Sequence, residues 1–202
     1  YDFDNRVRRF LKSAGSIDNP TYTLELKIDG LKVVLTYKNG ILVTAATRGN
    51  GEIGEDVTHN ARTIESIPLR LERKIDVTVE GEIYMKKSVL SQLNIERKKK
   101  GEEVFANPRN VAAGSIRQLD PKMAAARKLD AYIYDMAKSE IIPETQVDEL
   151  KQLQALGFKV NKHFNHVQTI EEVIYYWKTW QKKAPKEDYQ IDGVVVKVNE
   201  RY

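Results

Sequence analysis

The sequence of 202 residues contains no cysteine, which excludes a disulfide framework and a thiolate zinc site within it. No apolar run approaches the roughly 20 residues needed to span a bilayer, and no signal-peptide pattern opens the chain. The three histidines, His59, His163 and His166, are scattered, so we expect no metal site built from protein side chains alone. Together these absences favour a protein of the reducing cytoplasm that does not contact membranes.

The composition is that of a folded domain, with 41% hydrophobic and 31% charged residues. The length fits one large domain. The formal net charge is +4, and the densest basic run, residues 97–100, lies at the end of an expected helix. Because basic side chains favour the C-terminal end of a helix, a solvated helix end is the first interpretation of this run. A phosphate-contacting patch is the alternative.

The first third of the chain predicts a helix followed by a meander of strands. Apolar residues recur at helical spacing within residues 4–14, and Gly15 ends this segment. Strands are expected at residues 22–28, 31–38 and 41–47, and Asn39-Gly40 between the last two is a strong hairpin signal. The glycine-rich residues 48–54 are expected to form a loop.

The rest of the chain predicts helices placed between strands. Ser88 is expected to cap a helix that reaches residue 99, and residues 107–119 are expected to form a loop leading into a short helix. The other expected elements are a helix starting within 55–63, strands at 76–84, 129–136 and 192–198, and helices at 145–156 and 170–182. This order predicts an α+β fold with antiparallel sheets flanked by helices, rather than alternating β-α-β units.

Lys27 is the most informative residue, because it lies in E-L-K-I-D-G at residues 25–30. The expected strand stops at Asp29-Gly30, which places one amine between apolar neighbours with a carboxylate two positions away on either side. An amine that is desolvated and oriented in this way suits a lysine nucleophile. The same short pattern is also typical of a surface lysine before a turn, so the interpretation depends on the other motifs.

Four more motifs follow in order. They are A-T-R-G-N-G-E-I-G-E-D-V-T from residue 46, V-E-G-E-I-Y-M from residue 79, F-A-N-P-R-N-V-A-A-G-S-I-R-Q-L-D-P from residue 105 and I-D-G-V-V-V-K-V-N from residue 191. With E-L-K-I-D-G, they resemble the adenylation (nucleotidyltransferase) domain of bacterial NAD+-dependent DNA ligase across almost the whole chain. The first, third and fifth are shared with ATP-dependent ligases and mRNA-capping enzymes, whereas the second and fourth resemble the NAD+-dependent branch.

The resemblance implies the DNA ligase/mRNA-capping nucleotidyltransferase fold over residues 1–202. Residues 1–15 would be an N-terminal helix leading from a missing domain that recognises nicotinamide mononucleotide (NMN). Lys27 would attack the adenylyl phosphorus of NAD+, release NMN and become Lys-AMP, from which AMP passes to the 5′-phosphate of a DNA nick. The expected partners are NAD+, AMP or other adenine-site ligands, Mg2+ and nicked double-stranded DNA, and the expected state is a monomer.

The chain begins at Tyr1 rather than methionine, and we expect it to be a fragment of a longer ligase. The resemblance implies that an oligonucleotide-binding barrel, a four-cysteine zinc module, a helix-hairpin-helix region and a BRCT domain belong to the missing parts. Zinc is therefore expected only there. We expect the isolated fragment to be unable to seal nicks.

The resemblance assigns four residues to the adenosine half of the nucleotide. Glu25 is expected near the adenine, and Tyr134 is expected to stack on it. Arg48 and Glu82 are expected on the ribose side. Without the resemblance, Tyr134 would be interpreted as a core residue and Glu82 as an exposed strand glutamate.

Five further residues are assigned to the reacting phosphates. Asp29 supports the loop of the nucleophile, Asp192 faces the nucleophile, and Lys197 contacts the AMP phosphate. Arg109 and Arg117 are expected at the nick and nucleotide phosphates, because a guanidinium fork binds phosphate oxygens in pairs. A surface salt bridge is the alternative for Arg117.

Two requirements follow for this site. A free lysine is protonated at neutral pH, so we expect burial and nearby cations, Lys197 and Arg48, to favour the neutral form of Lys27. Strand alternation places Asp192 and Lys197 on opposite faces, so we expect strand twist or a bend at Gly193 to bring both to one site.

The sequence departs from the pattern of the family at three positions. Asn50 replaces the usual aspartate of the glycine-rich loop, which is a conservative turn substitution. Val111 stands where alanine is typical. Ala184, flanked by Lys183 and Lys186, lies near where a basic residue, commonly arginine, is usual, so the residue that makes this phosphate contact is open.

Two other functions are compatible with parts of the pattern. One is an ATP- or GTP-using nucleotidyltransferase, such as an ATP-dependent ligase or capping enzyme, which nucleotide preference distinguishes. The other is a nucleotide-binding module that has lost catalysis, against which the intact Lys27, Glu82 and Lys197 argue.

Overall fold

The computed structural model describes residues 1–15, 19–49 and 54–201. Its helices are α1 (Asp2–Ser13), α2 (Thr58–Ala61), α3 (Lys87–Lys99), α4 (Pro108–Ile116), α5 (Pro121–Ala126), α6 (Gln146–Ala155) and α7 (Ile170–Lys183), with a 3-10 turn at Ala184–Lys186. Its strands are β1 (Tyr22–Ile28), β2 (Leu31–Lys38), β3 (Ile41–Thr47), β4 (Val77–Tyr84), β5 (Asp130–Ser139), β6 (Asn165–Val167) and β7 (Ile191–Val198). Most of the expected glycine-rich loop, including Asn50, lies outside the described residues.

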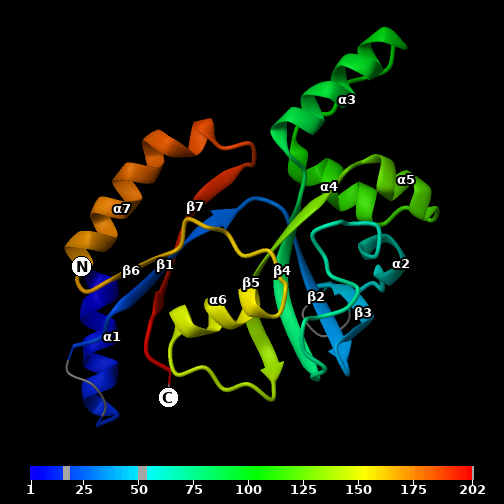
Figure 1. The fold of residues 1–202 in the computed structure, drawn as a ribbon. Helices are drawn as coiled ribbons and strands as arrows, with labels where there is room; N and C mark the ends of the chain where they lie inside the picture. Colours follow the sequence, from blue (N-terminus) through cyan, green and yellow to red (C-terminus); the bar gives the residue numbers. More distant parts are fainter. Residues whose placement is uncertain (16–18, 50–53, 202) are drawn as a thin grey trace.

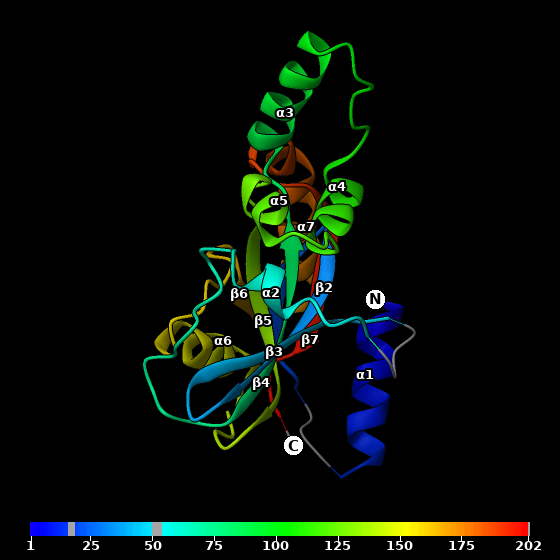
Figure 2. The ribbon, with the colours of Figure 1, turned by 90° about the vertical axis from the view of Figure 1, so that its right-hand side faces the viewer.

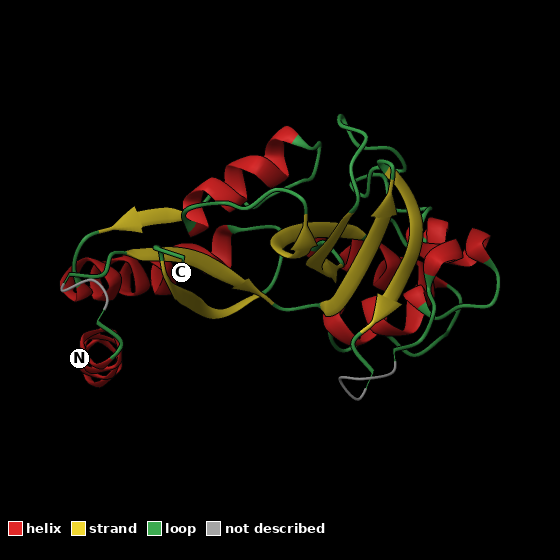
Figure 3. Cartoon of the chain, turned by 90° about the horizontal axis from the view of Figure 1, so that it is seen from below, coloured by secondary structure: helices red, strands yellow, loops and turns green. Residues whose placement is uncertain are grey.

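The strands form two antiparallel sheets, which confirms the α+β prediction (Figures 1 and 3). One sheet has three strands in the order β6-β1-β7, and the other has four in the order β3-β2-β4-β5. In the described part of the chain, every strand pair is antiparallel. Helix α7 packs against the three-stranded sheet, and α6 packs against β5 of the other.

Each sheet buries one face in its own hydrophobic core. In β1, Leu24 and Leu26 point toward α7, where they join Val173 and Trp180. The four-stranded sheet has a larger core, which includes the fully buried Leu150 and Leu153 of α6. Because strand side chains alternate, the opposite face of each sheet carries the polar residues.

The predicted three-strand meander is wrong at its first connection. Strand β1 pairs with β6 and β7, whereas β2 pairs with β3 and β4, so Asp29-Gly30 carries the chain from one sheet to the other. A Cβ atom on Gly30 would lie 2.3 Å from the carbonyl oxygen of Ile83, so only glycine fits this close crossing. The Asn39-Gly40 hairpin is confirmed, with φ of 47° and 74° at its two residues, as a type I′ turn requires.

Several helix predictions need correction. The helix expected to start within residues 55–63 is only the four-residue α2. Ser88 does not cap α3, whose N-cap position is Lys86, because the Ser88 hydroxyl bonds Asp188 at 2.6 Å. The sequence pattern does not predict α5 and β6, which are six and three residues long and so too short to show a periodic pattern.

Candidate active site between the two sheets

A cavity of about 230 Å³ lies between the polar faces of the two sheets. Its lining joins segments from most of the chain: Glu25, Leu26, Lys27, Ile28, Glu82, Arg109, Tyr134, Val195 and Lys197. Six of these nine are residues that the sequence assigned to nucleotide chemistry. The fold therefore collects most of the predicted site in one place.

The three-stranded sheet supplies the two lysines of the cavity. Glu25 and Lys27 alternate with the buried Leu24 and Leu26, so their side chains point away from α7. In the antiparallel register Glu25 lies opposite Val195, and Thr23 lies opposite Lys197, which places Lys197 on the same face. Lys27 and Lys197 thus enter the cavity from neighbouring strands.

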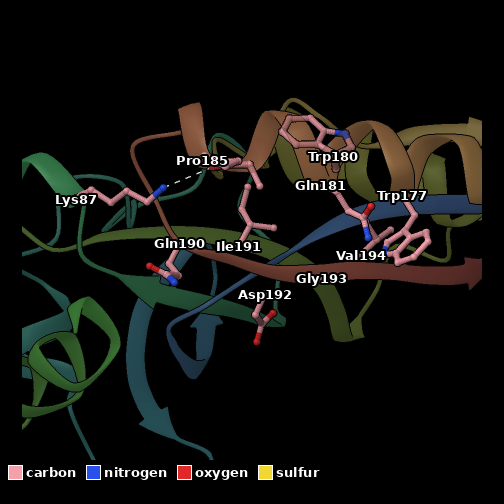
Figure 4. Close-up of a pocket in the computed structure, with 11 residues that line it drawn as sticks. Lys87, Trp177, Trp180, Gln181, Pro185, Gln190, Ile191, Asp192, Gly193 and Val194 are labelled. Atoms are coloured by element: carbon pink, nitrogen blue, oxygen red, sulfur yellow. Dashed lines mark hydrogen bonds between the residues drawn. The ribbon is translucent and has the colours of Figure 1, made fainter. Parts of the chain in front are cut away.

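A β-bulge brings Asp192 to Lys27. Lys27 pairs with Gly193, but Ile28 pairs with Ile191, which leaves Asp192 as the extra residue of β7. The bulge shifts the alternation by one residue, and Figure 4 shows Asp192 pointing to the opposite side of β7 from Ile191. The Lys27 amine and the Asp192 carboxylate are 2.6 Å apart. The expected bend near Gly193 is therefore this bulge.

A second bulge shapes the opposite wall. Glu80 pairs with Asp135 and Gly81 pairs with Ile133, so Tyr134 is an extra residue of β5. Tyr134 and Glu82 line the cavity from the four-stranded sheet, whereas Ile133 turns into the core. The same bulge places Asp135 on the cavity side. No sequence motif marks Asp135, so it was not among the expected site residues.

Lys197 is the central cation of this wall. Its amine lies 3.0 Å from Glu25 Oε1 and 3.8 Å from Asp135 Oδ1. It also donates to the backbone carbonyl of Tyr134 at 3.3 Å and lies 5.8 Å from the centre of the Tyr134 ring. Lys197 therefore joins the two sheets across the cavity.

Burial changes the protonation of the cavity acids. Desolvation raises the pKa of Glu82 to about 7, against the attraction of Arg109 and Lys27. Desolvation also raises the pKa of Glu25, against the attraction of Lys197. Glu25 Oε1 is buried and lies in the ion pair with Lys197, and its second lone pair can accept from a donor on a ligand. Burial likewise raises the pKa of the Tyr134 hydroxyl, which stays neutral.

Helix α4 brings Arg109 to the end of β1. Asn107 caps this helix by accepting from the backbone N–H of Asn110, and Pro108 occupies its first position. Arg109 in the first turn pairs with Asp29 at 3.0 Å. Asp29 follows β1 directly, so this ion pair lies beside Lys27.

Lys27 is not desolvated in the expected way. Its side chain is 55% exposed, and its nearest charged partner is the carboxylate of Asp192 rather than a cation. Arg48 is exposed at the end of β3 and does not line this cavity, and Lys197 is paired with Glu25. The expectation of burial beside two cations is therefore wrong for the described structure.

Arg117 lies apart from the cavity. It follows α4, and its Nε lies 2.5 Å from Glu55 Oε2. This contact is the surface salt bridge that the sequence offered as the alternative. Both side chains are about half exposed, at 46% and 61%, so the pair is free to exchange for another anion at little cost.

A second cavity, of about 440 Å³, lies on the other face of β7 and is shown in Figure 4. Trp177 and Trp180 of α7 line it, and so does Lys87. The Lys87 amine donates to the carbonyl of Ala184 at 3.5 Å and to that of Glu187 at 2.9 Å. Lys87 thus supplies a positive charge beside Ala184, although the expected candidates there were Lys183 and Lys186.

Two further searches cover the described residues only. No three His, Asp or Glu side chains gather there as a metal site. No helix among them has the length and apolar character needed to cross a membrane.

Comparison with known proteins places the chain in a family. Residues 1–202 match the family described as NAD-dependent DNA ligase adenylation domain. The chain is 50% identical over 201 residues to proteins named DNA ligase from Bacillus cereus (strain AH820) and Bacillus anthracis, covering 98% of this chain and 29% of each relative.

A solved structure supports the fold. The ligase domain of LigD from M. tuberculosis is 14% identical, with a TM-score of 0.52, and the match covers 90% of this chain and 50% of that one. At this identity the likeness concerns the fold alone. The family match over the whole sequence and the 50% identity decide the classification: the chain belongs to the NAD-dependent DNA ligase adenylation domain family.

Proposed function

We propose that this chain is the self-adenylylating part of an NAD+-dependent DNA ligase and that Lys27 is its nucleophile. The observation that carries the proposal is the position of the Lys27 amine, at the edge of a cavity whose other residues suit an adenosine phosphate. The neutral amine attacks the adenylyl phosphorus of NAD+, and an N–P bond forms as the P–O bond to NMN breaks. NMN leaves with its own phosphate, and Lys27 carries AMP.

Asp192 is the proton acceptor in this proposal. Only an amine with a free electron pair can attack phosphorus, so an acceptor for the amine proton is needed before or during attack. Asp192 Oδ2 lies 2.6 Å from the amine, within the range for direct transfer. Asp29 acts indirectly by holding Arg109 at the end of β1.

The adenosine half fits the inner part of the cavity. The buried Oε1 of Glu25, which pairs with Lys197, has a second lone pair that can accept a hydrogen bond from the exocyclic amine of adenine. Tyr134 offers an aromatic face for stacking. Glu82 and Lys197 flank the same space, where we assign Glu82 to the ribose and Lys197 to the AMP phosphate. Arg48 is assigned to the ribose as well, although it does not line the cavity of the described structure.

The phosphates need more positive charge than the cavity holds. Arg109 is assigned to the nucleotide or nick phosphates, and Arg117 joins it if it exchanges Glu55 for a phosphate. Mg2+ would supply charge neutralisation at the phosphates, held largely by water and phosphate oxygens. Lys87 is our candidate for the basic contact beside Ala184.

The later steps belong to the longer protein. The chain spans 29% of the length of the relatives that it matches, and we propose that residues 1–202 are one domain of such a protein. In it, AMP passes from Lys27 to the 5′-phosphate of nicked double-stranded DNA, and the 3′-hydroxyl then displaces AMP. We further propose that α1 connects to an NMN-recognition domain, that zinc binds elsewhere in the protein, and that the protein is a cytoplasmic monomer.

Intact-mass spectrometry tests the proposal on the full-length protein that carries this chain. The protein is incubated with Mg2+ and either NAD+ or ATP. We expect a gain of one AMP from NAD+ only, lost in Lys27→Ala and retained in Lys32→Ala, a neighbouring lysine that pairs with Glu80 at 2.5 Å. Gain from ATP instead would identify an ATP-dependent nucleotidyltransferase. No gain from either nucleotide would leave a binding module without catalysis.

A further inference from the structure

Residues 86–107 form a projection that we call the arm. It consists of α3 and the segment that returns to α4. Helix α3 has no buried residue along its 13 positions, and Figures 1 and 2 show it standing away from both sheets. Among the described residues, the partly buried Val89, Leu90 and Leu93 of its first half pack against the larger core, whereas no residue of its second half does, so the stability of the domain does not explain the outer part of the helix.

The arm is nevertheless held in a defined shape by its own return segment. Asn94 and the backbone of Phe105 exchange two hydrogen bonds, of 2.8 and 3.0 Å. Arg97 donates to the carbonyl of Glu103, pairs with Glu102 at 2.9 Å and lies 4.4 Å from the centre of the Phe105 ring. Because these contacts involve Arg97 inside the arm, Arg97 is a structural residue.

The tip of the arm carries three lysines whose side chains take no part in the contacts described above. Lys98, Lys99 and Lys100 are exposed, and among the described residues none of their amines has a carboxylate partner within 4 Å. Glu96 and Glu103 are exposed nearby, so the tip is not a broad positive field. Its feature is three unpaired amines at one place, each able to reach a single anionic group.

The arm is rooted beside the catalytic cavity. Lys87 at its base lines the second cavity, on the other face of β7, which Asp192 also lines, and Arg109, which lines the catalytic cavity, follows shortly after the end of the arm and pairs with Asp29. Thirteen helical residues, as in α3, extend about 20 Å. Successive phosphates of one DNA strand are about 3.4 Å apart along the helix axis, so the tip reaches about six base pairs from the base of the arm.

We propose that the arm is a duplex-DNA contact in which Lys98, Lys99 and Lys100 bind backbone phosphates about half a helical turn from the nick. The inference rests on the proposed function, because the ligase activity supplies the duplex. The arrangement favours DNA over a small anion, because side chains of consecutive helical residues point in different directions and so do not converge on one small anion. The contact would contribute affinity and register without sequence preference.

The test measures binding of the full-length protein to a nicked duplex as a function of salt. The variant replaces Lys98, Lys99 and Lys100 by Gln and keeps Arg97. The matched control replaces Lys74, Lys138 and Lys151 by Gln, which are also exposed but lie on loops and elements away from the arm. Each lost phosphate contact lowers the slope of log K against log salt by about 0.9, so three contacts lower it by about 2.7.

A second series locates the contact. The duplex is shortened stepwise on one side of the nick and then on the other. On one side, wild-type affinity should fall when fewer than about six base pairs remain, and the arm variant should not show this step. Formation of Lys-AMP from NAD+ should be unchanged in the variant, which separates the arm from self-adenylylation.

The two failures are distinguishable. If wild-type protein forms no Lys-AMP, the proposed function fails, whatever the DNA slopes show. If wild type forms Lys-AMP and seals nicks, but the arm variant has the slope and length dependence of wild type, the arm proposal is overturned. The proposal is also overturned if the arm variant and the control variant lower the slope of log K against log salt equally. The loss of three positive charges anywhere on the surface would then explain the effect.

Discussion

Glu82 should make the domain less stable as the pH rises, although it belongs to the proposed site. Desolvation raises the pKa of its carboxyl group from 4.5 in a free chain to about 7. The folded state therefore holds the proton more tightly than the unfolded state. The energetic cost of ionising Glu82 is absent below pH 4.5, grows between pH 4.5 and 7, and is constant above pH 7.

The size of the effect follows from the same values. A pKa moved from 4.5 to about 7 corresponds to about 3 kcal/mol at alkaline pH. Glu82 is only partly buried, so solvent screening reduces the expected cost to about 2 kcal/mol. For a domain of this size, that is a shift of about 4–8 °C in Tm.

Thermal unfolding followed by circular dichroism at pH 5 and pH 8 measures this effect. Glu82→Gln removes the ionisable group with little change of shape, so it should raise Tm at pH 8 and leave it nearly unchanged at pH 5. Glu80→Gln is the matched control, on the same strand and face but paired with Lys32, and it should not raise Tm at pH 8. Equal differences between Glu82→Gln and wild type at both pH values would refute the reasoning.

Three other substitutions test separate parts of the structure. Asp192→Asn should slow formation of Lys-AMP about 10²- to 10⁴-fold, and an unchanged single-turnover rate would exclude Asp192 as the acceptor. Gly30→Ala should cost about 1–3 kcal/mol of unfolding free energy, measured by guanidinium titration, because the new Cβ would lie 2.3 Å from a β4 carbonyl oxygen; wild-type stability would show that the crossing relaxes freely. Arg201→Met should cost about 3 kcal/mol because it leaves the fully buried Glu149 carboxylate without its cation, and adding Glu149→Gln should recover part of the loss. No recovery in the double variant would mean that the packing of Arg201, not its charge, matters.

The bounds of β1, β2 and β3 were predictable, because local sequence patterns determine where these strands begin and end. The bounds 22–28, 31–38 and 41–47 agree with the structure, and Asn39-Gly40 defines one turn by its backbone preference alone. Pairing was not predictable in the same way. Strand β1 finds its partners in β6 and β7, more than 130 residues later, and nothing local separates a meander from two sheets.

The candidate site was predictable as a set of residues but not as a geometry. The motifs identified Lys27, Glu82 and Lys197, which the fold does bring to one cavity. Strict alternation of side chains along β7 would place Asp192 and Lys197 on opposite faces of the strand. The sequence pattern cannot show where a strand contains an extra residue that changes this alternation. The bulges at Asp192 and Tyr134 depend on the register of two strands distant in sequence, so only the structure reveals them.

The charge balance of the cavity explains why a divalent cation belongs to the proposed reaction. Three cations, Lys27, Arg109 and Lys197, are each already paired with a carboxylate, at 2.6, 3.0 and 3.0 Å. Those partners are Asp192, Asp29 and Glu25, and the carboxylate of Asp135 lies 3.8 Å from the Lys197 amine. A dinucleotide that brings two phosphates into this space meets acids that outnumber the bases, so its entry is opposed unless positive charge accompanies it. In the proposed reaction, Mg2+ held by the phosphate oxygens and water would supply that charge. The affinity for NAD+ should therefore rise with the Mg2+ concentration. Asp192→Asn removes one negative charge and should make this dependence weaker.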